Sequence, residues 1–260
     1  MVKKGMLKVS TYRCMILFFL VIIRGCTNTE ASKVTIATSA NMQFAIQEIS
    51  NKFSKQTGID TQLIIGSSGK LTAQIKEGAP YDIFVAANMK YPNSLYKNKL
   101  TSESPKIYGQ GQLVLWTCYN DIPLSIEQLT SSKIKYIAIA NPKTAPYGEA
   151  AIHILKHYSL YDTLKHKLVY GESIAQTNQF ITSKSASIGF TAQSVVLSPK
   201  MKNKGHWMAI DTNAYRPINQ GVVMIKQASG NRMQAQKFYD FLFSKEAQET
   251  LKDFGYLIPD

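Results

Sequence analysis

The chain has 260 residues and a formal net charge of +13, from 30 basic and 17 acidic side chains. This length suits one large domain or two smaller ones, and 45% hydrophobic with 18% charged residues excludes disordered and collagen-like chains. Only one apolar run is long enough to consider as a membrane element, which excludes a protein with several membrane spans.

The N-terminal residues have the pattern of an export signal. Basic residues precede an unbroken apolar run over residues 14–23, which is too short to span a bilayer as a permanent helix. The following Ile-Arg-Gly-Cys sequence is similar to a bacterial lipobox, although its arginine stands where a small uncharged residue is usual. We expect residues 1–25 to be a signal peptide and Cys26 to carry a lipid. A plain signal cleaved after Ala31 and a retained membrane anchor are the alternatives.

Beyond the signal, charge is dispersed and cysteine is scarce. Without residues 1–25 the chain keeps 25 basic and 17 acidic residues, a net charge of +8. The basic residues are scattered, which is typical of a solvated surface, so we expect no nucleic-acid binding. Apart from Cys26 only Cys118 remains, and we expect no intramolecular disulfide in spite of export.

From Lys33 onward, predicted strands and helices alternate. The hydrophobic patterns predict strands over residues 33–38, 61–65 and 81–86, with helices from Met42 to a stop at Gly58 and over residues 70–77. After a pause they predict one long strand over 108–117, strands over 134–140, 167–170, 187–190 and 221–225, and helices over 148–158, 173–182, 231–243 and 245–254.

This alternation requires crossover connections and largely parallel sheets. We therefore expect an α/β fold of two lobes, each a mixed, mostly parallel sheet flanked by helices, with a ligand cleft between them. The first lobe is expected to take residues 32–112 plus 222–260, and the second lobe residues 113–221. The two crossings, near residues 111–113 and near Gly221, would form the hinge.

Four predicted strand-to-helix turns offer hydrogen-bond donors. They are Ser39 and residues 67–69, 145–148 and 171–174. The first N–H groups of a helix have no intrahelical partner and lie at the positive end of the helix dipole, so such turns bind anions. One turn alone is typical of ordinary capping. Two turns from each lobe together predict an anion bound between the lobes.

Several motifs occur in a specific order along the chain. They are residues 37–41 (Ala-Thr-Ser-Ala-Asn), 66–75 (Gly-Ser-Ser-Gly-Lys-Leu-Thr-Ala-Gln-Ile), 77–84 (Glu-Gly-Ala-Pro-Tyr-Asp-Ile-Phe), 108–115, 141–148 and 188–190. With these motifs, residues 33–258 resemble the molybdate-binding proteins of bacterial ABC importers, which have the type II solute-binding fold. The stretch from residue 66 to 84 carries the most specific part of the resemblance.

The resemblance implies that a tetrahedral oxyanion is held by neutral donors. Carried over to this chain, the donors are the hydroxyls of Ser39 and Ser68 and the backbone N–H groups of Ser39, Ser68, Tyr147 and Ile174. Some members add a tyrosine hydroxyl, but this chain has an alanine at the matching position, about Ala192. Molybdenum would be present only inside the oxyanion, and no separate cofactor is expected.

The function implied by the resemblance is transport. The chain would capture molybdate, and tungstate as well, and deliver it to the membrane permease of an ABC importer without catalysing a reaction. It is expected to act as a monomer in the periplasm or on the outer face of a bacterial membrane, anchored by a lipid at Cys26.

Two other functions compete with this interpretation. The same fold could bind another oxyanion such as sulfate or phosphate, although no candidate turn holds the arginine of a charge-paired clamp. A secreted hydrolase could use Ser68 or Ser39 as its nucleophile, but the sequence has no Gly-x-Ser-x-Gly elbow and no evident base.

Three further side chains are weighed as catalytic or metal-binding groups. His153 and His157 are four residues apart on a predicted helix, as zinc ligands are, but the glutamate that follows the first histidine in metalloproteases is absent. Surface positions are therefore favoured for both histidines. Asp82 could be a catalytic carboxylate, but its place at the start of a strand favours a structural role.

Overall fold

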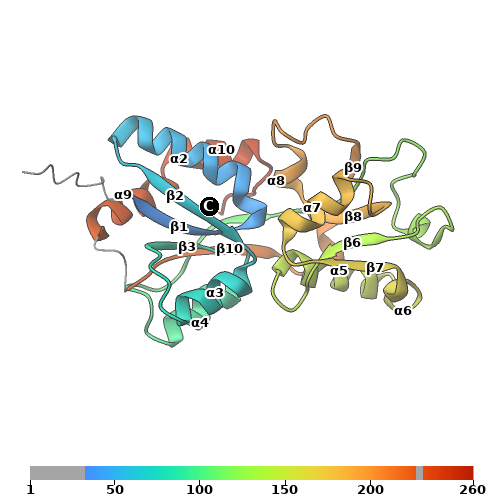
Figure 1. Cartoon of the computed structure of the whole chain (residues 1–260), viewed down its shortest axis with the longest axis horizontal. Coiled ribbons are helices and arrows are strands. Elements are labelled where there is room, and N and C mark those ends of the chain that lie inside the picture. The colour runs from blue at the N-terminus through green and yellow to red at the C-terminus, as the bar shows by residue number, and fades with distance from the viewer. Residues whose placement is uncertain (1–32, 227–230, 260) are drawn as a thin grey trace, which may run out of the picture. The chain divides into compact units, whose positions relative to one another are not determined.

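Two five-stranded sheets organise the described part of the chain, residues 33–226 and 231–259 of a computed structural model (Figure 1). The predictions for the signal peptide, residues 1–25, and for Cys26 lie outside these residues. Within them, no helix combines the length and the apolar character needed to cross a bilayer.

The first sheet has the strand order β2-β1-β3-β10-β4. Its strands are β1 (Val34–Ser39), β2 (Thr61–Gly66), β3 (Ile83–Val85), β4 (Lys106–Gly111) and β10 (Ile218–Met224). Strands β1, β2 and β3 are parallel, and β10 is antiparallel to both β3 and β4. Four of the five strands therefore point the same way.

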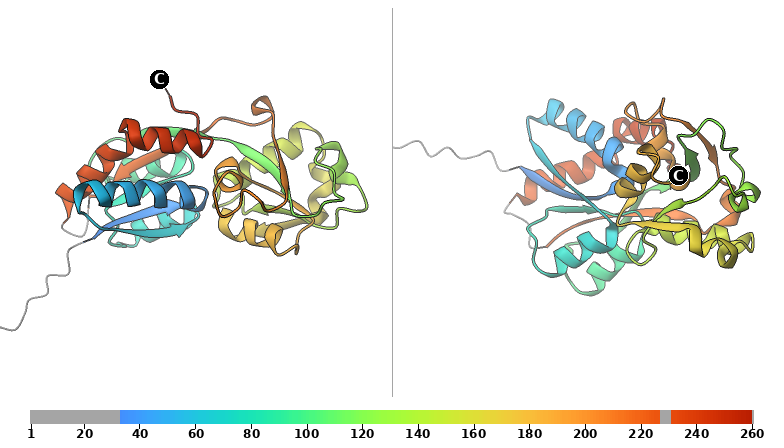
Figure 2. Two further views of the ribbon diagram at one scale, coloured as in Figure 1. Left: turned by 90° about the horizontal axis from the view of Figure 1, so that it is seen from above. Right: turned by 45° about the vertical axis from the view of Figure 1, so that its right-hand side comes forward.

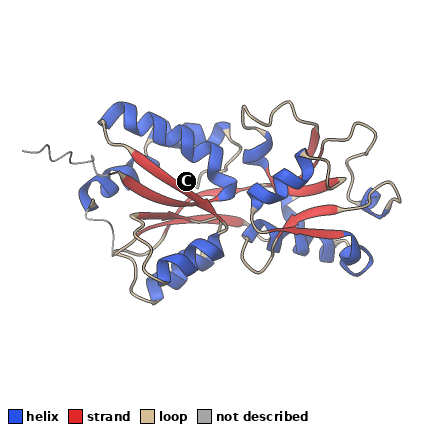
Figure 3. Ribbon diagram, in the orientation of Figure 1, coloured by secondary structure: helices blue, strands red, loops and turns tan. Residues whose placement is uncertain are grey.

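Helices cover both faces of this sheet (Figure 3). They are η1 (Ala40–Met42), α2 (Gln43–Thr57), α3 (Ser68–Lys76), α4 (Lys90–Lys97), α9 (Arg232–Leu242) and α10 (Lys245–Asp253). Because successive side chains of a strand point to opposite faces, Ile83 packs with α2, α9 and α10, while its neighbour Phe84 packs with α3 and α4. Strands buried on both faces explain the continuous apolar runs of the sequence.

The second sheet repeats this plan with the order β7-β6-β8-β5-β9. Its strands are β5 (Leu113–Thr117), β6 (Ile137–Ala140), β7 (Leu168–Gly171), β8 (Ile188–Ala192) and β9 (His206–Ala209). Its helices are η2 (Glu127–Thr130), α5 (Pro146–His157), α6 (Tyr161–Leu164), η3 (Lys165–Lys167), α7 (Ile174–Thr182), α8 (Gln193–Val196) and η4 (Thr212–Ala214). Only β5 runs against the other strands, so this sheet is also mixed and mostly parallel.

Helix α2 shows how local sequence determines an element. Ala45, Ile46, Ile49 and Phe53 recur at helical spacing, and all four are buried against the first sheet and its helices. The helix ends at Thr57 because Gly58 has a φ of 70°, a left-handed conformation that glycine adopts without a steric penalty. The predicted stop at Gly58 is confirmed.

The predicted long strand over residues 108–117 is wrong. The chain forms β4 in the first sheet, leaves it at Gln112 and forms β5 in the second sheet. Burial continues from the second half of β4 into β5, which is buried throughout, although the sheet changes. This is one of the two crossings between the sheets, and the other precedes β10 (Figure 2).

Several other elements differ from the sequence pattern, among them β6, which begins at Ile137 rather than at residue 134. Strand β10 begins at Ile218, three residues before the predicted start, and lies wholly in the first sheet. Helix α4 and strand β9 are not predicted at all: α4 contains Pro92 and a largely polar sequence, and the residues of β9 are only partly buried. The sheets thus hold residues 34–111 with 218–224, and 113–209, while the finer lobe limits stay a prediction.

Candidate functional site

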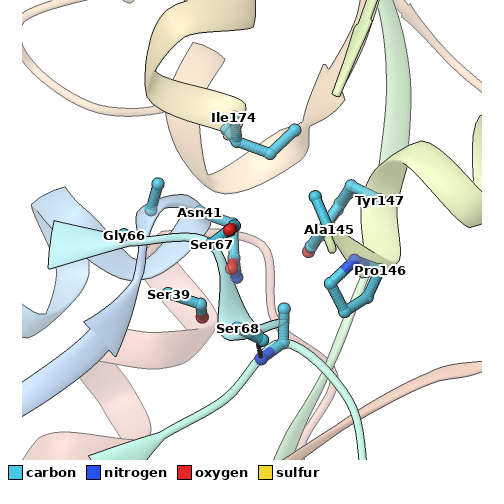
Figure 4. Close-up of a pocket in the computed structure, with 11 residues that line it drawn as sticks. Ser39, Asn41, Gly66, Ser67, Ser68, Ala145, Pro146, Tyr147 and Ile174 are labelled. Atoms are coloured by element: carbon cyan, nitrogen blue, oxygen red, sulfur yellow. Dashed lines mark hydrogen bonds between the residues drawn. The ribbon is translucent and has the colours of Figure 1, made fainter. Parts of the chain in front are cut away.

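A small pocket lies at the carboxyl ends of strands from both sheets (Figure 4). Its lining residues are Ser39, Ala40, Asn41, Gly66, Ser67, Ser68, Ala87, Ala145, Pro146, Tyr147 and Ile174. The four predicted ligand residues, Ser39, Ser68, Tyr147 and Ile174, are thus brought together. The cavity is small: about 10 Å³ is open to the centre of a water-sized molecule, which is the room of roughly one such molecule.

Helix starts from both lobes lie at this pocket. Ser39 precedes η1, Ser67 precedes α3, Ala145 precedes α5 and Ser173 precedes α7, each in an extended backbone conformation. The first N–H groups after each of these residues have no partner inside the helix. Pro146 occupies the first turn of α5, where its lack of an N–H costs nothing.

Three serines of the first lobe line the pocket, and their hydroxyls differ in whether they have a hydrogen-bond partner. Ser68 is fully buried, and its Oγ accepts the backbone N–H of Ala87 at 3.0 Å. The Oγ atoms of Ser39 and Ser67 are buried and have no hydrogen-bond partner among the described residues. A buried polar atom without a partner is uncommon and costly, so both hydroxyls are available to a bound group.

The pocket is electrically neutral. Among the described residues that line it, none is a carboxylate, an imidazole, an ammonium or a guanidinium group. An anion would therefore be held by hydroxyl and N–H dipoles and by the ends of helix dipoles. Neither a general base nor a charged partner is present at the three serines.

Beside the pocket, a buried network joins the two lobes through the side-chain amide of Gln220. Its Oε1 accepts from Asn41 Nδ2 at 2.9 Å and from Tyr108 Oη at 2.5 Å, and its Nε2 donates to Tyr147 Oη at 3.0 Å. A Cβ on Gly111 would lie 2.0 Å from Tyr147 Oη, so glycine at the crossing makes room for this bond.

The same network extends to the C-terminal segment and to α8. The second N–H of the Asn41 amide donates to Tyr256 Oη at 3.0 Å, and Ser194 Oγ donates to the carbonyl oxygen of Asn41 at 2.8 Å. Burial is the largest cause that raises the pKa values of Tyr108, Tyr147 and Tyr256. These phenols therefore stay neutral and serve as hydrogen-bonding groups.

Contacts between the lobes also surround the pocket. Gly69 N–H donates to the carbonyl oxygen of Thr144 at 2.9 Å, and a Cβ on Gly69 would lie 2.9 Å from Thr144 Cα. On the surface, Lys70 and Glu172 form an ion pair at 3.0 Å. The lobes are thus in contact around the pocket in this structure.

The other candidate residues lie outside the pocket. Asp82 is fully buried and accepts the backbone N–H of Thr35 at 2.7 Å, which ties β1 to the start of β3. His153 is half-buried in a separate groove, and the ring of His157 contacts that of Tyr158. The described residues hold no group of three or more histidine, cysteine and acidic side chains placed to bind a metal ion.

Ala192 is buried at the end of β8, so this chain has no tyrosine hydroxyl at that position.

Two residues that line the pocket were missing from the predicted ligand set. Asn41 and Ser67 were not among the predicted ligand residues, although Ser67 lies in one of the four predicted donor turns. The local signal for Ser67 was its place before a helix, which it shares with many capping residues.

Comparison with known proteins identifies the family. Residues 34–257 match the bacterial extracellular solute-binding proteins. The chain belongs to this family. Its two-lobed fold is that of a solute-binding protein, and the relatives are named as binding proteins.

Individual relatives place this solute-binding protein more closely. The molybdate-binding protein ModA of Azotobacter vinelandii is 35% identical over 231 residues, which cover 87% of this chain and 90% of that protein. YvgL of Bacillus subtilis (strain 168), named as a substrate-binding lipoprotein of an ABC transporter, is 27% identical over 246 residues, or 90% and 93% of the two chains.

A solved structure supports the same placement. The periplasmic molybdate-binding protein of Azotobacter vinelandii superposes with a TM-score of 0.83 at 30% identity, over 88% of this chain and 100% of that one. The resemblance to molybdate-binding proteins and the two-lobed type II fold expected from the motifs are confirmed.

Replacing the central amide tests the network. In Gln220→Ala, buried groups of Asn41, Tyr108 and Tyr147 lose their partner, and we expect the free energy of unfolding to fall by about 2–4 kcal/mol. Urea unfolding measures this value. The exposed Gln62 provides the control, since Gln62→Ala should change it by less than about 0.5 kcal/mol. Equal losses in both variants would contradict a structural role for the network.

The network also predicts a loss of stability at alkaline pH. The pKa values of Tyr108, Tyr147 and Tyr256 are raised in the folded state, whereas an unfolded tyrosine titrates near about 10. Above that pH the unfolded chain releases protons first, so stability is intact below it and is lost as the pH rises further. Melting temperatures should fall above this pH, and less steeply in Tyr147→Phe; an identical slope in this variant would contradict the assignment.

Proposed function

We propose that this solute-binding protein captures molybdate, and tungstate as well, outside the cytoplasm and delivers it to the permease of an ABC importer. The observation that carries the proposal is the small neutral pocket, lined by serine hydroxyls and by helix starts from both lobes. The names of the molybdate-binding relatives support the choice of anion. The proposal needs no cofactor and no catalytic step.

In the proposed complex, Ser39 and Ser68 donate their hydroxyls. The backbone N–H groups of Ser39, Ser68, Tyr147 and Ile174 complete the donor set. An anion that enters a closed pocket loses its hydration shell, and each oxygen needs replacement hydrogen bonds. Fixed dipoles supply these bonds without burying a cation that would be unpaired when the pocket is empty.

Selection among oxyanions would follow from size. Molybdate and tungstate have nearly the same dimensions and are larger than sulfate. A rigid ring of donors that fits the larger ions holds a smaller one at poor hydrogen-bond distances, and so rejects it. Phosphate is also disfavoured, because no arginine or lysine lines the pocket to pair with its charge.

Binding would be coupled to closure of the two lobes. The sequence predicts a first lobe of residues 32–112 plus 222–260 and a second lobe of residues 113–221. Because β10 lies in the first sheet from Ile218 onward, we move the second boundary to residue 218 and place the hinge at the two crossings. Donors from both lobes reach the same pocket, so an anion that contacts all of them favours the closed state. A monomer is sufficient for this mechanism.

Export and lipid attachment complete the proposal. The family is extracellular, and a substrate-binding lipoprotein is among the relatives. We infer that residues 1–25 are removed and that Cys26 carries the lipid, which would hold the receptor beside its permease. The hydrolase alternative is disfavoured, because no described lining residue could act as a base for Ser39 or Ser68.

Calorimetric titration tests the choice of anion. The purified chain without its signal should bind sodium molybdate and sodium tungstate at micromolar concentrations or below, with similar affinities, and bind sulfate far more weakly. Both tight-binding anions should raise the melting temperature. Clear binding of sulfate without binding of molybdate would show that the anion is wrong.

A proline substitution sharpens this test at Ile174. This residue is the first of α7, where proline fits the helix but removes the N–H. We expect Ile174→Pro to bind molybdate roughly 10- to 100-fold more weakly, as for the loss of one hydrogen bond to a charged group. The matched control Ile174→Val keeps the N–H and should bind like the wild type.

Cell fractionation tests the lipid anchor. In a bacterial host, the wild-type protein should sediment with membranes, while Cys26→Ser should be released in soluble form because it lacks the lipidated thiol. Membrane association that is unchanged in Cys26→Ser would contradict lipidation and favour the retained anchor.

A further inference from the structure

Ser67 is a buried polar residue whose side chain is not used by the fold. It precedes α3 with φ −76° and ψ 148°, the backbone conformation of a helix-capping residue. A capping serine would accept an N–H from the first turn of the helix, but Ser67 makes no side-chain bond of this kind. The structure therefore does not explain this hydroxyl as a cap.

The position of the hydroxyl points to a ligand. Ser67 is 4% exposed, and its Oγ has no hydrogen-bond partner among the described residues. It lines the same pocket as Ser39 and Ser68 (Figure 4). A hydroxyl that is shielded from solvent and unpaired costs about 1–3 kcal/mol, which a bound acceptor would recover.

Ser67 and Ser68 differ in what else they do. Ser68 Oγ accepts the N–H of Ala87, so its hydroxyl links α3 to the segment after β3 as well as lining the pocket. The Ser67 hydroxyl has no such structural bond among the described residues. Removal of the hydroxyl should therefore weaken ligand binding without lowering the stability of the free protein.

We propose that the Ser67 hydroxyl is a third hydroxyl donor to the bound tetrahedral oxyanion and contributes to its selection. This rests on the proposed function. The first lobe then supplies hydroxyls from Ser39, Ser67 and Ser68, and the second lobe supplies backbone N–H groups at Tyr147 and Ile174. The four oxygens of a tetrahedral dianion have enough lone pairs to accept all of these bonds.

Two substitutions at Ser67 test the role of the hydroxyl. Ser67→Ala and Ser67→Gly both remove it, and glycine is tolerated before a helix at a cost of only a few tenths of a kcal/mol. Calorimetry with sodium molybdate should show an affinity that is roughly 10-fold or more weaker in both variants. The melting temperature of the free protein should not fall in Ser67→Ala, because the hydroxyl that this variant loses is buried and unpaired.

Two other serines provide matched controls. Ser50 lies in α2, outside the pocket, and its Oγ is also buried and unpartnered, so Ser50→Ala should leave molybdate affinity unchanged. Ser68→Ala should lower both the affinity and the melting temperature of the free protein, because Ala87 loses its acceptor.

The outcomes separate this inference from the proposed function. Wild-type binding of molybdate with unchanged affinity in both Ser67 variants would overturn the role of Ser67 and leave the proposed function standing. A loss of affinity only in proportion to a loss of stability would assign Ser67 to the fold instead. If the wild type binds none of molybdate, tungstate and sulfate, both the proposed function and this role are wrong.

Discussion

The site depends on the buried amide of Gln220. This side chain accepts hydrogen bonds from Asn41 and Tyr108 of the first lobe and donates one to Tyr147 of the second lobe. A buried amide is stable only when its partners are in place, so the lobes and the start of α5 are positioned together. The backbone N–H of Tyr147 is thereby held at the pocket by a bond made by its own side chain.

Close approach of backbone segments is a second constraint on the same region. A Cβ on Gly111 would overlap Tyr147 Oη, and one on Gly148 would lie 2.0 Å from the carbonyl oxygen of Ala140. Gly69 similarly admits Thr144 of the opposite lobe. Glycine is required at these positions because of neighbouring atoms rather than a positive φ. The narrowness of the pocket follows from these contacts.

A pocket lined without charged side chains suits a protein that binds and releases an anion repeatedly. A cation buried opposite the anion would be costly whenever the pocket is empty, and a receptor must repeatedly bind and release its ligand. Serine hydroxyls and helix N–H groups avoid that cost, because they are dipoles fixed by the fold. The basic residues that give the chain its positive net charge are absent from the described lining.

The sequence by itself determined the alternation of strands and helices, the end of α2 at Gly58 and the turns that face the pocket, because these depend on local periodicity and conformation. Only the tertiary structure decided that residues 108–117 divide between two sheets, because the local residue pattern of a strand does not specify which sheet the strand joins. It also decided which serine hydroxyl is bonded and which is unpaired. The partners of Gln220 come from positions up to 179 residues away, and contacts at such separations leave no local pattern in a single sequence.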